Sequence, residues 1–432
     1  MLEINTIERF NEVSKNRVIV IIGAGITCKN FLNKTNNNDN ANIIICDNNV
    51  ELQETGVELN GYKHKIFALE LIKEMAVDNV VVVIAAKDYS NIYAQLFNYI
   101  DKNTPIFVYP FIETREVQYK KQIKQCLSDY YYHNHYDLKY RDKFIENEYE
   151  KLEKNGGMVI PYLPIYLTTK CTLNCDKCNN LMPYLKENSK NADFSLEKIQ
   201  KSLTYVLDCV QEITFCELVG GEPFLYRDFN KILEYVGESK KIRQIVVVTN
   251  GTICPAESTL ELLKKYNVLV RISDYGMFEK MSQLVVILER YGINVRVLQD
   301  MRWNDPGDID GRGKSKEELY FQYNSCIFSL RCKYLCEDKL FTCARIASLY
   351  LLGKYTGEED FLNINSALSE DELYEFYMSD IGNGCDYCDL CSITGADEIP
   401  AALQKGKKQI DHSLYTIIRN DYLDRLKKNQ KR

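Results

Sequence analysis

The chain has 432 residues, of which 45% are hydrophobic and 27% are charged. These are the values of an ordinary globular protein, and they exclude a collagen-like fibre, a coiled-coil rod and a chain disordered throughout. The 54 Lys and Arg residues against 61 Asp and Glu residues give a formal net charge of −7. Because phosphate contacts need a basic surface, we expect no nucleic-acid partner.

The compartment bears on how the 16 cysteines are interpreted. The N-terminus MLEINTIERFNEV has no basic start followed by an apolar run, as a signal peptide would have. The longest apolar run, 80–86, has the size of a strand rather than of a membrane-spanning helix. We therefore expect a cytoplasmic protein with no membrane partner. Since a reducing cytosol disfavours disulfides, the cysteines indicate metal.

Strand and helix patterns alternate through residues 1–112. Strands are predicted at 17–22, 43–46, 80–86 and 106–109, and helices after the first strand, at 68–75 and at 92–100. Such alternation predicts a Rossmann-like domain with an open parallel sheet and helices on both faces. The polar, tyrosine-rich stretch 113–157 predicts a helical linker that ends at Gly156 and Gly157.

A second α/β alternation runs through residues 158–310. Strands are predicted at 165–168, 212–219, 244–248, 268–272 and 294–298, and helices at 196–210 behind the N-cap Ser195, at 229–236 and at 281–288. Polar residues follow these strands, so we predict a partial (β/α)6 barrel of the TIM type with its chemistry at the carboxyl ends. Beyond it, residues 311–432 lose this regularity and accumulate cysteines.

Cys171, Cys175 and Cys178 have the spacing C-x3-C-x2-C on a loop directly after a predicted strand. Three thiolates can hold three irons of a cubane 4Fe–4S cluster and leave the fourth iron open. An open coordination position distinguishes a catalytic metal site from a closed structural one. Structural zinc is the alternative, but it usually needs paired C-x2-C elements or histidines, and none of the four histidines is adjacent.

The cysteine motif resembles the cluster-binding signature of the radical S-adenosylmethionine (SAM) superfamily. Further motifs match in the order of that family, each at a predicted strand end: Gly220-Gly221-Glu222-Pro223, Thr249-Asn250-Gly251, and Ser273 within 272–276. The resemblance implies that these segments bind SAM through Gly220, Gly221, Glu222, Pro223, Thr249, Asn250 and Ser273, with Glu222 accepting from the methionine ammonium. The family usually has an aromatic residue before the third cysteine to pack on the adenine. Here that residue is Lys177, so the adenine contact is not assigned.

The resemblance also implies a mechanism. The amine and carboxylate of SAM chelate the open iron, and one electron from the cluster cleaves a carbon–sulfur bond. The resulting 5′-deoxyadenosyl radical abstracts hydrogen from a substrate, while the protein binds, orients and excludes water and oxygen. An electron donor such as flavodoxin or ferredoxin is then a partner.

The C-terminal cysteines resemble the auxiliary-cluster extension called SPASM, or its shorter form called twitch. Cys326, Cys332, Cys336 and Cys343 read C-x5-C-x3-C-x6-C, and Cys385, Cys388 and Cys391 read C-x2-C-x2-C. The resemblance implies one auxiliary 4Fe–4S cluster on Cys326, Cys332, Cys343 and one of the last three, with 339–343 as a hairpin strand. One cluster is favoured over two, because the cysteine run needed for a second is not intact. A structural zinc at 385–391 is the alternative.

The remaining cysteines lack ligand spacing. Cys336 is expected to be buried, and we predict that six others are small core residues, namely Cys28, Cys46, Cys126, Cys209, Cys216 and Cys254.

Gly23-Ala24-Gly25 lies between a predicted strand and helix and forms a G-x-G-x-x-G pattern whose last glycine is lost. Asp47 ends the next strand, at a spacing close to that of a ribose-binding acid. The pattern predicts a nucleotide site; the alternative is that the glycines only make the tight turn. This region also looks like small Rossmann-like domains attached to enzymes of surface-polysaccharide and nucleotide-sugar metabolism.

We therefore expect a radical SAM enzyme that acts on a sugar, a nucleotide-sugar or a related small metabolite. Candidates to line its pocket lie near predicted strand ends: Arg271, Trp303, Asn304, Asp305 and Arg312. A peptide substrate is the alternative, because the auxiliary extension is common among peptide-modifying relatives. A non-catalytic iron–sulfur protein is the third hypothesis, and the SAM-contact motifs argue against it.

Overall fold

The structure is a computed structural model. It describes residues 7–35, 42–75, 79–86, 92, 95–96, 98–101, 103–109, 115–134, 137–188, 190, 192–275, 278–298, 302–307, 309–314, 319, 322–323, 326, 329, 333–354, 360–378, 388 and 398–404. Two compact units, Met1–Gln118 and Tyr119–Arg432, make up the chain. The finer division into four segments stays a prediction.

The first unit contains a five-stranded parallel sheet in the order β5-β2-β1-β6-β7. Its strands are β1 Val18–Ile22, β2 Ile43–Cys46, β5 Ile66–Phe67, β6 Val80–Ile84 and β7 Ile106–Val108. The four predicted strands are confirmed. All of β6 is buried, which explains its continuous apolar run.

Short elements complete the first unit: helices α1 Ile7–Val13, α2 Ile26–Thr35 and α3 Val50–Thr55, and the antiparallel pair β3 Val57–Leu59 and β4 Tyr62–His64. The helix predicted at 68–75 is instead a 3-10 helix, η1 Leu69–Glu74. It buries only Leu69 and Ile72. The helix predicted at 92–100 lies largely outside the described residues.

The second unit is built on a sheet of order β12-β11-β10-β9-β8-β14-β15-β16. Adjacent strands from β8 to β12 are parallel, β14 is parallel to β8, and β15 and β16 are antiparallel additions. The bounds are β8 Val159–Tyr166, β9 Glu212–Val219, β10 Ile242–Thr249, β11 Leu269–Ser273, β12 Asn294–Leu298, β14 Tyr334–Cys336, β15 Lys339–Phe341 and β16 Phe361–Asn363. Over the described residues the sheet is open, with β12 and β16 as its edges. The α/β architecture with parallel sheets is thus confirmed.

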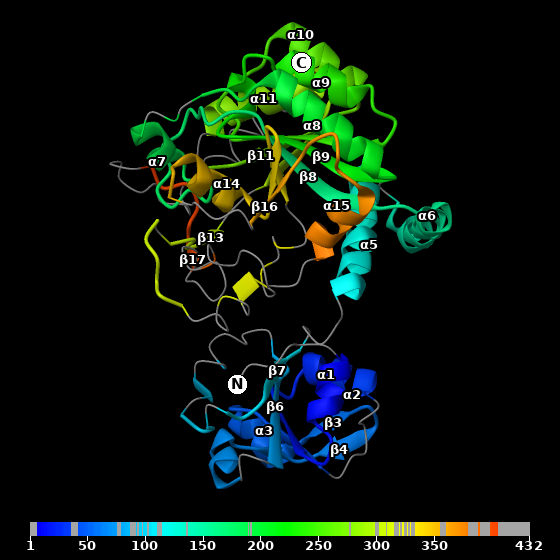
Figure 1. Ribbon diagram of the computed structural model, residues 1–432, viewed down its shortest axis with the longest axis vertical. Coiled ribbons are helices and arrows are strands. Elements are labelled where there is room, and N and C mark those ends of the chain that lie inside the picture. Colours follow the sequence, from blue (N-terminus) through cyan, green and yellow to red (C-terminus); the bar gives the residue numbers. More distant parts are fainter. Residues whose placement is uncertain are drawn as a thin grey trace, which may run out of the picture. The chain divides into compact units, whose positions relative to one another are not determined.

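The helices of the second unit are α5 Arg115–Asn134, α6 Arg141–Asn155, α7 Met182–Glu187, α8 Leu196–Cys209, α9 Phe229–Gly237, α10 Glu257–Lys265, α11 Phe278–Tyr291, α14 Ala344–Leu351 and α15 Glu370–Met378, with 3-10 turns η3 Leu138–Tyr140 and η4 Pro223–Leu225. In Figure 1, α8 to α11 gather on one side of the strands. Ser195 caps α8 by accepting from the Lys198 amide at 3.3 Å, as predicted. None of the described helices is long and apolar enough to cross a membrane.

One strand prediction was wrong in extent. The strand expected at 165–168 begins at Val159, and all eight of its residues are buried. Pro161 and Pro164 break the sequence pattern, but a strand buried on both faces shows no polar alternation to guide its assignment. β8 lies between β9 and β14 in the sheet, and the cysteine loop follows its carboxyl end.

A half-buried ion network ties α6 to the sheet. The Arg243 guanidinium donates to both oxygens of Glu212 at 2.8 and 2.7 Å and to Glu148 of α6 at 2.8 Å. The paired carboxylates hold the pKa of Arg243 above its usual value. Such a planar fork cannot be reproduced by an ammonium group.

We expect Arg243→Lys to lower the free energy of unfolding by about 1.5–3 kcal/mol, because an ammonium group cannot reproduce the forked hydrogen bonds to Glu212 and Glu148. Denaturant unfolding measures this loss. The control is Arg141→Lys, whose exposed partner Asp142 contributes about 0–1 kcal/mol. Equal stability of the two variants would contradict the assignment.

Candidate functional site

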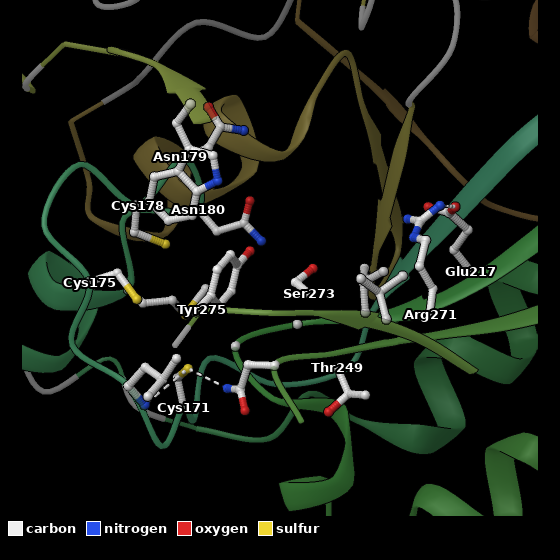
Figure 2. A pocket seen from close by; sticks show the side chains of 18 of the residues that line it. Cys171, Cys175, Cys178, Asn179, Asn180, Glu217, Thr249, Arg271, Ser273 and Tyr275 are labelled. Atoms are coloured by element: carbon white, nitrogen blue, oxygen red, sulfur yellow. Dashed lines mark hydrogen bonds and ion pairs between the residues drawn. The ribbon is translucent and has the colours of Figure 1, made fainter. Parts of the chain in front are cut away.

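A cavity of about 230 Å³ opens at the carboxyl ends of β8 to β11. Cys171, Cys175 and Cys178 line it from the loop that follows β8. Figure 2 shows the three sulfur atoms on one side of this cavity, with Ser273 and Arg271 across from them. Left-handed backbone at Lys177 (φ 54°) lets the loop turn between the second and third cysteine. Tertiary structure thus brings the predicted cluster ligands to one place.

Gly220 and Gly221 hold the cysteine loop against the end of β9. The Gly221 amide donates to the Thr168 carbonyl at 2.8 Å, and the Glu222 amide donates to the Lys170 carbonyl at 2.7 Å. A Cβ on Gly220 would lie 2.6 Å from the Thr168 oxygen, and one on Gly221 would collide with the Lys170 carbonyl. Only glycine allows the two backbones to approach this closely.

Glu222 is fully buried and links the second motif to the third. Its carboxylate accepts from the Thr249 hydroxyl at 2.8 Å, the Asn250 amide at 3.0 Å and the Phe224 amide at 3.3 Å. Burial nevertheless raises the pKa of Glu222 to about 7. Neither Glu222 nor the buried Pro223 is among the residues that line the cavity, so direct contact with an ammonium stays a prediction.

Asn250 connects the third motif to the cysteine loop. Its Nδ2 donates to the Thr172 hydroxyl at 3.1 Å and lies 3.6 Å from the Cys171 sulfur. Its Oδ1 accepts from the Thr252 amide at 3.0 Å. The predicted residues Gly220, Gly221, Thr249, Asn250 and Ser273 all line the cavity beside the three cysteines.

Tyr275, Trp303 and Tyr334 are the aromatic residues along the described cavity wall, and the rings of Tyr275 and Trp303 meet edge to face with centroids 5.6 Å apart. Lys177, which stands where the family has an aromatic residue, is 3.7 Å from the Asp305 carboxylate. Trp303 was predicted to line the pocket, whereas Tyr275, which lies within the motif 272–276, was not assigned a role from the sequence.

The three thiols lie in an environment that disfavours the free thiolate. Burial raises the pKa of Cys171 to about 11 and that of Cys175 to about 12. Burial also raises the pKa of Cys178, although backbone hydrogen bonds from Met182 and Asn180 and the Arg345 guanidinium act in the opposite direction. Metal binding must therefore release these protons, so we expect loading to be favoured by alkaline conditions.

An ion pair lies at the end of the cavity away from the cysteines. Arg271 of β11 reaches across β10 to Glu217 of β9 at 2.9 Å (Figure 2). Glu217 is 6% exposed and Arg271 is 27% exposed, so the carboxylate is buried behind the guanidinium. Arg271 and Trp303 line the cavity as predicted.

The other pocket candidates were wrong. Asn304, Asp305 and Arg312 are not among the lining residues. Asn304 follows Trp303 on β13 Arg302–Asn304, and alternate side chains of a strand point to opposite faces. Asn304 and Arg312 are exposed, and Asp305 faces Lys177.

The donor set fits a multi-iron cluster with SAM. Three sulfurs face one cavity together with backbone that can approach a ligand closely, and the Asn179 Oδ1 in the lining is buried without a hydrogen-bond partner. Among the described residues, no group of three His, Cys, Asp or Glu side chains is arranged to hold a single metal ion.

The C-terminal cysteines are only partly described: Cys332, Cys385 and Cys391 lie outside the described residues. Cys388 packs against Leu319 and Tyr323, and its carbonyl accepts from Gln322 at 2.9 Å. The Cys326 amide donates to the Tyr323 carbonyl at 3.2 Å. The turn that leads to Cys326 therefore also contacts Cys388.

The predicted hairpin strand is confirmed as β15, and Cys343 follows it at the start of α14. Glu337, in the turn between β14 and β15, has a left-handed backbone with φ 51°. Cys336 is buried as expected. Among the other cysteines, Cys28, Cys46, Cys126 and Cys216 are buried as predicted. The prediction was wrong for Cys254, which is exposed, and for Cys209, which is half-buried near the end of α8.

The N-terminal glycine motif has a packing explanation. Gly23 has φ +101°, and a Cβ there would lie 2.8 Å from the Ala85 carbonyl oxygen. Asp47 accepts from the Ala24 amide at 2.9 Å and from the Asn49 amide at 2.9 Å. Gly25 has open space around it, and Cys28 is fully buried. Both carboxylate oxygens of Asp47 thus hold the loop, and a nucleotide contact stays a prediction.

Comparison with known proteins addresses the central part of the chain. Residues 165–273 match the model of the radical SAM superfamily. The chain is 32% identical over 179 residues to the antilisterial bacteriocin subtilosin biosynthesis protein AlbA of Bacillus subtilis, covering 37% of this chain and 38% of AlbA. It is 31% identical over 100 residues to the GTP 3′,8-cyclase of Clostridium acetobutylicum, covering 23% of this chain and 30% of that protein.

The solved structure of native anSMEcpe with bound AdoMet and Cp18Cys peptide is similar with a TM-score of 0.37 and 14% identity, over 55% of this chain and 93% of that one. The chain spans less than half the length of the two curated relatives. The matched region contains the three-cysteine loop and the motifs at the ends of β9, β10 and β11. The chain therefore carries a radical SAM domain, which includes residues 165–273.

Proposed function

We propose that the chain is a radical SAM enzyme. It holds a 4Fe–4S cluster on Cys171, Cys175 and Cys178, binds SAM along the ends of β9 to β11, and removes hydrogen from a substrate. The observation that carries this proposal is that the three cysteines line one cavity with Gly220, Gly221, Thr249, Asn250 and Ser273. We interpret β8 to β12 with α8 to α11 as the partial barrel, and the first unit as a Rossmann-like domain.

When bound, the cluster and SAM supply one-electron cleavage of a carbon–sulfur bond and the hydrogen abstraction that follows. The residues of the chain itself bind the cluster and SAM and orient them. Gly221 lets the loop backbone approach, Glu222 fixes Thr249 and Asn250, and Asn250 supports the Cys171 side of the cavity. An electron carrier such as flavodoxin or ferredoxin is the proposed partner.

The auxiliary cluster is also a proposal. Its ligands are Cys326, Cys332, Cys343 and one of Cys385, Cys388 and Cys391. Cys388 is supported by its contacts with the turn that precedes Cys326, through Gln322 and Tyr323.

A peptide is the substrate class that we propose. The relative AlbA is named for bacteriocin biosynthesis, and its match covers 37% of the chain. Gly23 and Asp47 have contacts within their own domain that need no nucleotide, so they do not specifically favour a sugar or nucleotide-sugar substrate. In the cavity, the Arg271–Glu217 pair and the amide of Asn179 offer hydrogen bonds to peptide groups.

The test is anaerobic reconstitution followed by iron counting and product analysis. With two cubane clusters we expect about eight irons per chain, and about four in the triple variant Cys171→Ala, Cys175→Ala, Cys178→Ala. With SAM and dithionite, only the parent should form 5′-deoxyadenosine. The control Cys254→Ala removes an exposed thiol and should retain both properties. Absence of iron, or equal product from the triple variant, would overturn the proposal.

The substrate class has its own experiment. The loaded enzyme is incubated with SAM, dithionite and either a library of short peptides or UDP-glucose. We expect a peptide whose mass changes in proportion to the 5′-deoxyadenosine formed. A product from UDP-glucose alone would reverse the assignment.

A further inference from the structure

A short segment near the C-terminal end of the described chain, Glu398–Gln404, covers the outer side of the cysteine loop. Its strand β17 Glu398–Pro400 pairs antiparallel with β13, placing Ile399 opposite Trp303. Ala402 packs in an apolar cluster with Leu173 and Cys175. The segment therefore lies against the loop that holds the proposed cluster, although more than two hundred residues separate them.

Backbone contacts fix this segment to the loop. The Asp176 amide donates to the Leu403 carbonyl at 2.5 Å, and Cys175 and Gln404 form an isolated antiparallel bridge. The loop residues on both sides of Cys175 thus have partners in the segment, which leaves Cys175 7% exposed.

The side chain of Gln404 reaches the sulfur itself. Its Oε1 accepts from the Asn174 amide at 2.8 Å, and its Nε2 donates to the Cys175 sulfur at 3.1 Å and to the Ala402 carbonyl at 2.9 Å. Because a backbone amide can only donate, it fixes the oxygen of the side-chain amide. The N–H group must then face the sulfur.

We propose that Gln404 is a positioning residue for the cluster, donating a hydrogen bond to the ligating sulfur of Cys175 and making the cluster easier to reduce. The inference rests on the proposed function. Reduction adds negative charge that thiolate sulfurs share, and a hydrogen-bond donor stabilises the more negative state. The partners of ligating groups commonly contribute as much as 10- to 100-fold to metal affinity or activity.

The sequence carries no signal of this contact. Gln404 lies in a stretch without a motif, and its partner is 229 residues earlier. A donor to the cluster from this segment also means that the segment and the cysteine loop must be in place together before the cluster reaches its working potential.

The test uses the full chain, reconstituted, in three variants. Gln404→Leu keeps the size of the side chain and removes the donor, whereas Gln404→Glu keeps an acceptor for Asn174 and places negative charge near the sulfur. Gln125→Leu is the matched control, because Gln125 is exposed on α5 and bonded only to Asp129 at 3.0 Å among the contacts described. The readout is the reduction potential of the cluster whose electron paramagnetic resonance signal changes on addition of SAM.

We expect the reduction potential of the cluster in Gln404→Leu to be more negative by about 59 mV. For one electron this corresponds to a tenfold change in the ratio of reduced to oxidised cluster. The shift should be larger in Gln404→Glu, with iron content unchanged in both. Potentials equal to that of Gln125→Leu would overturn the proposal. Loss of the cluster from both Gln404 variants would also overturn it, assigning Gln404 to loop support alone. A parent protein without a SAM-sensitive signal would instead refute the proposed function.

Discussion

Gly221→Ala should abolish assembly of the iron site on Cys171, Cys175 and Cys178. The new Cβ would collide with the Lys170 carbonyl oxygen, lying 2.7 Å from the Lys170 carbonyl carbon and 2.9 Å from the Cys171 Cβ. These atoms are backbone or begin the ligand side chain, so no flexible group can move aside. A displacement of about 1 Å in a catalytic arrangement costs on the order of 100-fold in rate. Iron per chain and 5′-deoxyadenosine formed after reconstitution measure the loss.

The matched control is Gly237→Ala at the end of α9. A Cβ there would lie 2.5 Å from the Tyr266 ring, so this variant should also lose stability. It lies outside the cavity lining, and we expect its iron content and product yield to remain those of the parent once folded. If Gly221→Ala kept full iron and activity, the close approach of the two backbones would have no functional importance.

Glu222→Gln should weaken SAM use by about 10- to 100-fold in kcat/KM while leaving iron content unchanged. The amide keeps the shape of the carboxylate, and its single oxygen can still accept from the Thr249 hydroxyl and the Phe224 amide, whereas the Asn250 amide loses its acceptor. What disappears is a negative charge beside the predicted place of the SAM ammonium, and a hydrogen bond to a charged group contributes about 1.5–3 kcal/mol. The measurement is the dependence of 5′-deoxyadenosine formation on SAM concentration.

The pH dependence of the parent follows from the same group. Burial raises the pKa of Glu222 to about 7, so the carboxylate is ionised only above that pH. We therefore expect KM for SAM to fall as pH rises through 7 in the parent and to stay flat in Glu222→Gln.

The free energy of unfolding should decrease with rising pH, whereas SAM binding should improve. The folded state keeps the Glu222 proton up to pH about 7, whereas the unfolded chain loses it near the usual 4.5. The free energy of unfolding thus falls by up to about 3 kcal/mol as the pH rises from about 4.5 to about 7. The stabilising contribution of the protonated Glu222 is fully present only below this range. Glu212→Gln is the control, since Glu212 lies at the other end of β9 and pairs with Arg243. Identical pH profiles for the two variants would remove Glu222 from this role.

Local patterns in the chain were sufficient for much of the architecture. Ile43–Cys46 and Glu212–Val219 have the predicted bounds: the first is a short apolar run that ends at Asp47, and the second is rich in apolar residues and ends at Gly220. The three-cysteine spacing and the glycines of Gly220-Gly221 were found for a related reason. The spacing of metal ligands and a backbone position that accepts only glycine can both be recognised within a few neighbouring residues of the sequence.

Contacts between segments that are distant in the chain have no comparable local sequence pattern. The bonds of Glu222 with Thr249 and Asn250 and the ion pair of Arg271 with Glu217 across an intervening strand were not predicted. Asn304 and Arg312 were expected at the pocket and are exposed instead. A residue type and its position after a strand do not determine which way its side chain points.

The sequence alone therefore determined the α/β alternation, the cysteine loop and the order of the motifs, since each depends on spacing along the chain. Only the tertiary structure decided which groups meet at the sulfur atoms, as the Gln404 contact with Cys175 shows at 3.1 Å. The physical reason is that hydrogen bonds and close packing act through space, and the fold brings together residues whose separation in sequence carries no periodicity.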